Sequence, residues 1–225
     1  MESMRMTLLV GSTRKKGTSF SFARTIKQLA EHRGKPTGII YVIDYYDQHR
    51  DVSELRTVLQ DSDTIGLVMP MYVDTIPAPV IWFLEKISSQ FKDELAGKAM
   101  FAVSQCGFPD ATLLEPSLES CKLFAISHWM DWLGGIGYGG GAIIDGTFVE
   151  ELGKKGEAIT RGFSLAVDDI IAGRKIRPEA RELLTARVPR LAYRPLAMFL
   201  NYRSRKLAKK YGVKKIKGRV LLEES

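Results

Sequence analysis

The chain has 225 residues, of which 45% are hydrophobic and 26% are charged, a balance typical of a folded domain and not of a disordered chain. Two cysteines cannot form the disulfide framework of a secreted protein, and the first apolar run ends at Gly11, so we expect an intracellular, cytoplasmic protein without a secretory leader. The formal net charge of +7 comes from the C-terminal part of the chain, which argues against a nucleic-acid-binding core.

The N-terminal segment has the pattern of a strand, a polar loop and a helix. The apolar run at 6–10 predicts a strand, and apolar residues spaced three and four apart at 20–32 predict a one-faced helix. Between them lie Ser12, Arg14, Gly17, Thr18 and Ser19. Because free N–H groups and the positive dipole end face outward at a helix start, such a loop suits phosphate. An ordinary turn with N-cap residues would have a similar composition.

Two familiar phosphate loops do not match this segment. A nucleoside-triphosphate loop needs Lys after the second glycine, where this chain has Thr18. A dinucleotide loop needs a second glycine at position 13, which is Thr13. The remaining interpretation is a hydroxyl-rich loop for a phosphomonoester, to which Arg14 can add a forked, charge-assisted contact.

The following segments alternate strands and helices. We predict strands at 38–44, 64–69, 98–104 and 134–144, and helices at 52–60, 77–87, 112–132 and 150–172. The apolar stretch 64–84 resembles a membrane span, but Pro70, Pro77 and Pro79 interrupt it and favour a strand, a loop and a helix. The pattern predicts an α/β fold with a doubly wound, five-stranded parallel sheet.

Three loops of this predicted sheet leave from the carboxyl ends of strands. They are the loop at 11–19, the loop at 71–76 and the loop at 105–110. In open α/β sheets ligands bind beyond the carboxyl ends of the strands, near the point where the strand order reverses. We therefore expect the three loops to line one binding site.

The three loops resemble those of the flavodoxin-like, FMN-dependent NAD(P)H oxidoreductases, which include NADPH-dependent FMN reductases and related quinone reductases. The resemblance rests on Gly11 to Ser19, on Pro70-Met71-Tyr72 with Pro77-Ala78, and on Cys106-Gly107-Phe108-Pro109, and it covers about residues 6–172. It implies a flavodoxin-like FMN-binding domain at 1–173, followed by a basic, helical extension at 174–225.

The resemblance also implies roles for individual residues. The FMN phosphate would contact Ser12, Thr13, Arg14, Gly17, Thr18 and Ser19, and the isoalloxazine ring would contact Pro70, Met71, Tyr72, Val73, Cys106, Gly107 and Phe108. Backbone N–H groups near Tyr72 and Gly107 would bond the polar edge of the ring.

No side chain is expected to be catalytic, because FMN carries a hydride from NAD(P)H to a small-molecule acceptor such as a quinone or another flavin. A flavodoxin-type electron carrier without nicotinamide turnover is the alternative. Such carriers are strongly acidic, whereas this core is only mildly so.

Several other residues are interpreted as structural. No Cys-x-x-Cys is present, which excludes the iron–sulfur members of the superfamily, and three scattered histidines offer no metal site. We expect Cys106 to be a buried, inert thiol and His128 to be a packing residue. The glycines at 134–141 allow either close approach of a cofactor or second subunit, or tight helix packing. Asp44 is expected to end the second strand, where a dinucleotide-binding fold has an acid that bonds the ribose. Because the glycine motif of such folds is missing, we do not assign this role to Asp44.

The C-terminal extension is strongly basic. From Arg174 onward it has 16 Lys/Arg and four Asp/Glu, a net charge of about +12. Residues 191–211 place apolar residues on roughly one helical face, with basic residues around them. Such a helix either contacts an anionic membrane peripherally or packs on the core or on a second subunit. We also expect a homo-oligomer, a dimer or tetramer.

Overall fold

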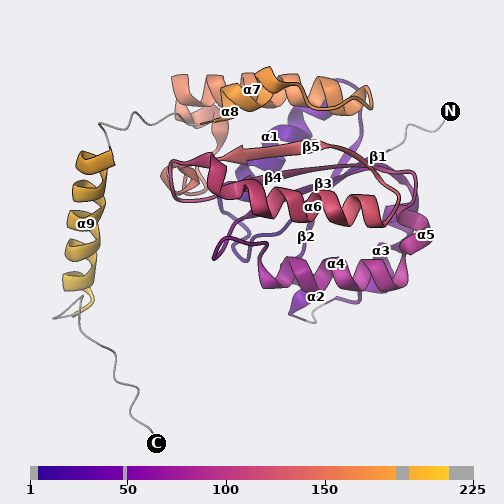
Figure 1. Ribbon diagram of the computed structural model, residues 1–225, viewed down its shortest axis with the longest axis horizontal. Helices are drawn as coiled ribbons and strands as arrows, with labels where there is room; N and C mark the ends of the chain where they lie inside the picture. The colour runs from indigo at the N-terminus through magenta and orange to yellow at the C-terminus, as the bar shows by residue number, and fades with distance from the viewer. Residues whose placement is uncertain (1–4, 48–49, 186–192, 213–225) are drawn as a thin grey trace, which may run out of the picture. The chain divides into compact units, whose positions relative to one another are not determined.

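The computed structural model describes residues 5–47, 50–185 and 193–212. Its contacts divide the chain into two compact units, Met1–Ala186 and Arg187–Ser225. The first unit contains the sheet and its covering helices, and the second contains the helix α9, Tyr193–Lys210 (Figure 1).

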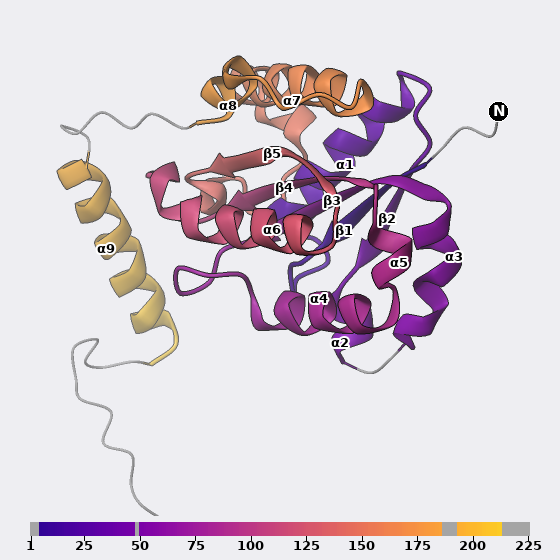
Figure 2. The ribbon, with the colours of Figure 1, turned by 45° about the vertical axis from the view of Figure 1, so that its right-hand side comes forward.

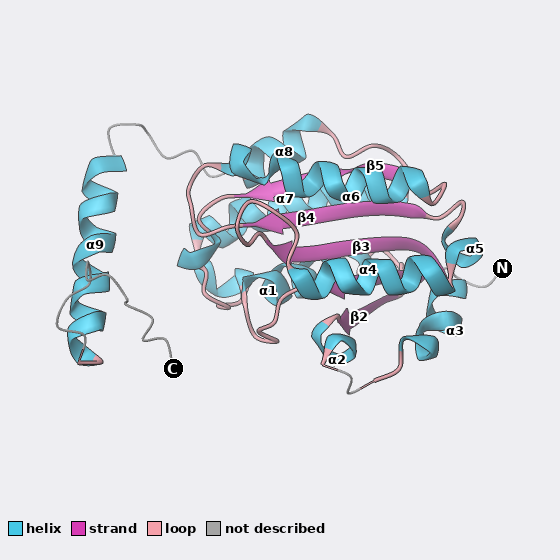
Figure 3. Cartoon of the chain, turned by 60° about the horizontal axis from the view of Figure 1, so that its bottom comes forward, coloured by secondary structure: helices cyan, strands magenta, loops and turns pink. Residues whose placement is uncertain are grey.

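The first unit has a five-stranded sheet in the order β2-β1-β3-β4-β5, and every neighbouring pair is parallel (Figure 3). The order confirms the predicted doubly wound α/β fold, which is flavodoxin-like. The strands are β1 Arg5–Val10, β2 Thr37–Tyr41, β3 Ser62–Pro70, β4 Ala99–Gln105 and β5 Asp131–Tyr138.

Helices cover both faces of the sheet, as expected for parallel strands (Figure 2). The longer helices are α1 Thr18–Glu31, α4 Ala78–Gln90, α6 Glu115–Ser127 and α7 Lys154–Ile171. The shorter ones are α2 Ile43–Tyr46, α3 Leu55–Gln60, α5 Lys92–Leu95 and α8 Pro178–Leu184, and 3-10 turns lie at Val52–Glu54, Ala111–Leu114, Gly141–Ile143 and Val149–Leu152. On one face α1, α7 and α8 bury a core that includes Phe22 and Phe163, and on the other α2, α3, α4 and α6 bury a second core that includes Tyr45 and Phe83.

The fifth strand begins and ends earlier than the sequence predicts. The helix expected at 112–132 stops at Ser127, because Trp129 adopts a left-handed conformation with φ 52° and reverses the chain. Met130 N–H then returns to Ala125 O at 2.9 Å, and β5 starts at Asp131. The strand ends at Tyr138, since Gly140 has φ 74° and leads into the 3-10 turn at Gly141–Ile143.

Asp44 and His128 both make contacts with neighbouring side chains of the fold. Asp44 does not end a strand: β2 stops at Tyr41, and Asp44 lies in α2, where its carboxylate pairs with Lys15 Nζ at 2.5 Å. His128 is buried, its Nε2 lies 2.6 Å from Ser88 Oγ, and its ring stacks on Phe124 with centroids 4.2 Å apart. His128 is thus a packing residue, as expected.

The first unit extends beyond the predicted boundary at residue 173. Asp169 of α7 is almost fully buried and accepts hydrogen bonds from Arg177 N at 3.0 Å, Nε at 2.8 Å and Nη2 at 2.6 Å. The Arg177 guanidinium holds the pKa of this carboxyl well below its usual range. Ile176 and Leu184 are buried in the same core as α1 and α7. Segment 174–185 therefore packs as part of the first unit.

Candidate functional site

The candidate site lies at the carboxyl edge of the sheet. Strand β1 is flanked by β2 on one side and β3 on the other, so the strand order reverses between β1 and β3. The loops after β1 and β3 leave from this switch point, and the loop after β4 leaves from the neighbouring strand. The three loops singled out in the sequence therefore do leave from the same edge.

The loop after β1 brings a helix start to the switch point. Gly11 N–H donates to Val68 O at 2.9 Å, and a Cβ on Gly11 would lie 2.4 Å from Val80 Cγ2, so the loop leaves the sheet under α4. Ser12 Oγ accepts from Arg14 N at 3.1 Å and turns the chain. Gly17 is the N-cap of α1 and supplies no side-chain cap, which leaves the first N–H groups of α1 without a capping oxygen.

The hydroxyl groups of this loop differ in what they contact. Thr18 Oγ1 donates to Gly141 O at 2.9 Å, so this hydroxyl already holds a neighbouring segment. Ser12 and Ser19 are also buried, and Ser19 Oγ has no hydrogen-bond partner among the described residues. Buried hydroxyls are nearly always bonded in folded proteins, so the Ser19 hydroxyl is a candidate ligand-binding group.

A fourth segment closes this edge. It is the 139–147 connection between β5 and α7, and its first glycines belong to the run at 134–141 for which the sequence left open either close approach of a cofactor or second subunit, or tight packing. Gly140 N–H donates to Phe108 O at 2.6 Å and Gly141 N–H donates to Cys106 O at 2.7 Å. A Cβ on Gly139 would lie 2.5 Å from Pro109 O. These glycines therefore allow close packing between two loops.

The same segment supplies the counter-ion of Arg14. Arg14 Nη2 lies 3.0 Å from Asp145 Oδ1, and both side chains are about 70% exposed (68% and 71%). Asp145 has φ 43° and Gly146 has φ 82°, and a Cβ on Gly146 would lie 2.2 Å from Lys16 O. The turn at 145–146 thus packs directly against the loop after β1. No local sequence pattern near Arg14 points to Asp145.

The loop after β3 forms a tight hairpin. Met71 N–H donates to Gln105 O at 2.8 Å, and Tyr72 and Thr75 exchange backbone hydrogen bonds of 3.1 and 3.2 Å. Val73 and Asp74, at its tip, have φ values of 50° and 58°. A β-branched residue rarely adopts this left-handed conformation, and such strain is concentrated at functional sites. Tyr72 N–H already donates to Thr75 O, so a bond from this loop to the ring would come from another N–H group near Tyr72.

The loop after β4 combines a buried thiol with an exposed ring. Cys106 is buried, its Sγ donates to Phe108 O at 3.4 Å, and burial raises the pKa of the thiol, which keeps it neutral near pH 7. Gly107 and Phe108 are exposed. Gly107 N–H has no backbone acceptor within the described residues and is an available donor in this loop.

Exposed apolar groups border the edge on three loops. Tyr72 and Val73 follow β3, Phe108 follows β4 and Ile143 follows β5, and each is between 46% and 94% exposed. Pro70 and Met71, which precede Tyr72, are buried. The edge thus has polar donors at the α1 end and apolar side chains on the neighbouring loops. Within the part of the chain that is described, no group of three His, Cys, Asp or Glu is arranged to hold a metal ion.

The fold is shared with solved flavoproteins. The structure of an NADH:FMN oxidoreductase in its apo form matches with a TM-score of 0.57 at 16% identity, over 79% of this chain and 94% of that one. The structure of RosB with bound 8-demethyl-8-formylriboflavin-5'-phosphate gives a TM-score of 0.56 at 14% identity, over 98% and 92%. An FMN-dependent NADH-azoreductase from Bacillus anthracis, in complex with FMN, gives 0.51 at 13%, over 74% and 99%.

Sequence comparisons place the chain in a family. Comparison with curated proteins found no match. The family profile described as NADPH-dependent FMN reductase matches residues 4–131, more than half of the chain, and this range contains the loops after β1, β3 and β4. The chain therefore belongs to the NADPH-dependent FMN reductase family.

Proposed function

We propose that the protein is an FMN-dependent NAD(P)H oxidoreductase that passes a hydride from a nicotinamide, by way of FMN, to a quinone, a flavin or a similar small acceptor. When bound, FMN supplies the redox chemistry, and the chain supplies binding, orientation and electrostatics. Family membership supports the cofactor and the reductant. The acceptor class and the site residues are inferred here from chemistry.

The observation that carries the proposal is a set of unsatisfied donors beside the switch point. The start of α1 has no capping side chain, and Ser19 Oγ is buried without a partner among the described residues. Backbone N–H groups at a helix start favour a phosphate, and a hydroxyl can donate to it. Ser12, Thr13 and Gly17 belong to the same loop, and Arg14 adds a positive charge. The residues present thus fit the phosphate end of FMN.

The neighbouring loops suit a flat aromatic ring. Tyr72, Val73 and Phe108 expose apolar surface that a ring would cover, and an aromatic contact adds about 0.5–1.5 kcal/mol beyond burial. Gly107 N–H is the donor that we assign to the polar edge of the ring, where a fixed dipole stabilises negative charge. Cys106 contributes packing, because its neutral thiol is a poor nucleophile.

Steady-state turnover tests the proposal. The purified protein should be yellow with flavin absorption bands, and it should oxidise NADPH or NADH when a quinone is supplied. Retention of flavin without turnover of either nicotinamide would favour the flavodoxin-type carrier. Absence of flavin binding would refute both readings.

A dimer or tetramer is part of the proposal. The outer surface of α6 exposes Leu123 and Ile126, and Trp129 follows them with 65% of its surface exposed. Exposed apolar side chains grouped in this way are typical of an interface. Sedimentation velocity of the holoprotein should give a mass of two or four chains, and a monomer at micromolar concentration would contradict the assembly.

A further inference from the structure

Helix α9 carries positive charge without negative charge, and most of the positive charge lies in its C-terminal half. Between Tyr193 and Lys210 the sequence has no Asp or Glu. The helix carries six cationic residues: Arg194, Arg203, Arg205, Lys206, Lys209 and Lys210. The described side chains of these residues are exposed. Without acidic residues in the helix, its positive charge is not balanced by pairs three or four residues apart, as it is on most solvated helices.

The same helix exposes large apolar side chains. Met198, Phe199, Tyr202 and Leu207 are between 55% and 73% exposed, and Tyr211 directly after the helix is 73% exposed. Arg203 lies over the ring of Phe199, 5.9 Å from its centroid. Apolar and cationic side chains therefore occur side by side on the helix surface, and a surface of this kind marks an interaction site.

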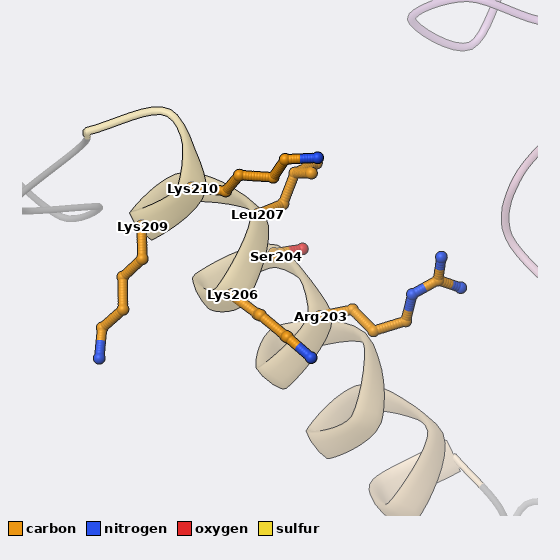
Figure 4. Close-up of a pocket in the computed structure, with 6 residues that line it drawn as sticks. All are labelled: Arg203, Ser204, Lys206, Leu207, Lys209 and Lys210. Carbon is orange, nitrogen blue, oxygen red and sulfur yellow. The ribbon is translucent and has the colours of Figure 1, made fainter.

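The cationic side chains extend from more than one side of the helix. In Figure 4, Arg203, Leu207 and Lys210 extend toward one side, while Lys209 extends toward the other. Long lysine and arginine stems can lie along an apolar layer while their charged ends stay in a polar one. This arrangement suits a boundary between an apolar and an anionic layer.

We propose that α9 docks on an anionic lipid surface and lies in the plane of the headgroups. The lipid surface offers negative charge for the basic residues and an acyl boundary for Phe199 and Leu207. A nucleic acid would match the charge alone and leave these apolar side chains in water. No described helix is long and apolar enough to cross a membrane, so the contact proposed is peripheral.

This inference goes beyond the proposed redox function, and neither depends on the other. A lipid-soluble quinone, one of the proposed acceptors, would be concentrated in such a surface. Lipid binding, however, is measured without flavin or turnover, so failure of one proposal would not be mistaken for failure of the other.

The test is sedimentation of the full chain with vesicles. Vesicles of phosphatidylcholine alone are compared with vesicles that also contain phosphatidylglycerol, at low and at high ionic strength. Each Lys or Arg near an anionic surface contributes about fivefold to the partition coefficient. Replacing three lysines should therefore weaken binding about a hundredfold. The variant is Lys206→Gln with Lys209→Gln and Lys210→Gln, and the matched control is Lys86→Gln with Lys92→Gln and Lys154→Gln, three exposed lysines of the first unit.

The wild-type chain should sediment with phosphatidylglycerol vesicles at low salt and should be released at high salt. The triple lysine variant of α9 should stay largely in solution at low salt. Phe199→Ser with Leu207→Ser should also weaken binding, whereas the control triple variant should sediment like the wild type. The proposal is overturned if the wild type stays in solution at low salt, or if the control variant is released equally. It is also overturned if a DNA duplex displaces the vesicles, or if the triple lysine variant of α9 changes the oligomeric state and leaves vesicle binding unchanged.

Discussion

Replacing Ser19 by alanine should change apoprotein stability and FMN affinity in opposite directions. Ser19 is 1% exposed and its hydroxyl has no partner among the described residues. A buried hydroxyl without a partner costs about 1–3 kcal/mol, and alanine is the better helix former in the first turn of α1. We expect the free energy of unfolding of Ser19→Ala apoprotein to rise by about 1 kcal/mol, which corresponds to about 2–4 °C in Tm.

The same substitution should weaken cofactor binding. A hydrogen bond to a charged phosphate oxygen contributes about 1.5–3 kcal/mol, so Ser19→Ala should raise the Kd for FMN about 10-fold to 150-fold. Stability is measured by urea unfolding without flavin, and affinity by quenching of FMN fluorescence. A loss of apoprotein stability together with unchanged FMN affinity would refute the assignment of this hydroxyl to the phosphate.

Ser21→Ala is the matched control. Ser21 lies one half-turn further along α1, and its hydroxyl donates to Thr147 O at 2.8 Å. Its removal leaves a structural hydrogen bond unmade, so the apoprotein should lose about 1 kcal/mol of stability. The change in FMN affinity should be much smaller than that of Ser19→Ala.

Four further outcomes are expected. Arg14→Gln should raise the Kd for FMN about tenfold, the lower end of the range for a charge-assisted hydrogen bond, because Arg14 is exposed. As a control, Arg161→Gln, at an exposed arginine of α7, should leave the Kd in the FMN fluorescence titration unchanged. Gly11→Ala should lower the free energy of unfolding by about 1–3 kcal/mol through overpacking, as followed by urea denaturation. Asp169→Asn should lower the free energy of unfolding by about 2 kcal/mol. Because the Arg177 guanidinium holds the folded-state pKa of Asp169 below the pKa of an unfolded aspartate, this stabilisation is complete above the unfolded pKa and is lost as the pH falls through the folded one, which acid titration of stability would follow. Iodoacetamide should modify Cys106 slowly in the native protein, and faster only at alkaline pH, as detected by mass spectrometry.

The order of elements and three of the loops at the site were predictable from local pattern. The nearly continuous apolar run at 64–69 indicates a strand buried on both faces, and β3 is that strand. Alternation of strands and helices then fixes where the carboxyl ends lie. The loops containing Ser12, Tyr72 and Cys106 were identified in this way, because each directly follows a strand.

Other features depend on contacts between distant residues. Thr18 has a hydroxyl group and lies at a helix start, as a phosphate ligand would, but this hydroxyl donates to Gly141 O. No local sequence pattern reveals that contact. Asp145 pairs with Arg14 across the fold. The helix end at Ser127 depends on a left-handed Trp129, a conformation that tryptophan seldom adopts. The hydrogen bond between Asp169 and Arg177 holds segment 174–185 against α7. From charge composition alone, this segment was predicted to begin the basic C-terminal extension.

Whether the loop after β1 binds the phosphate of FMN is best measured by comparing FMN with riboflavin, because riboflavin has the same ring and lacks the phosphate. The wild-type protein should bind FMN far more tightly than riboflavin, and Ser19→Ala and Arg14→Gln should reduce this ratio while riboflavin affinity stays constant. Equal affinities of the wild type for FMN and riboflavin would show that this loop does not bind the phosphate.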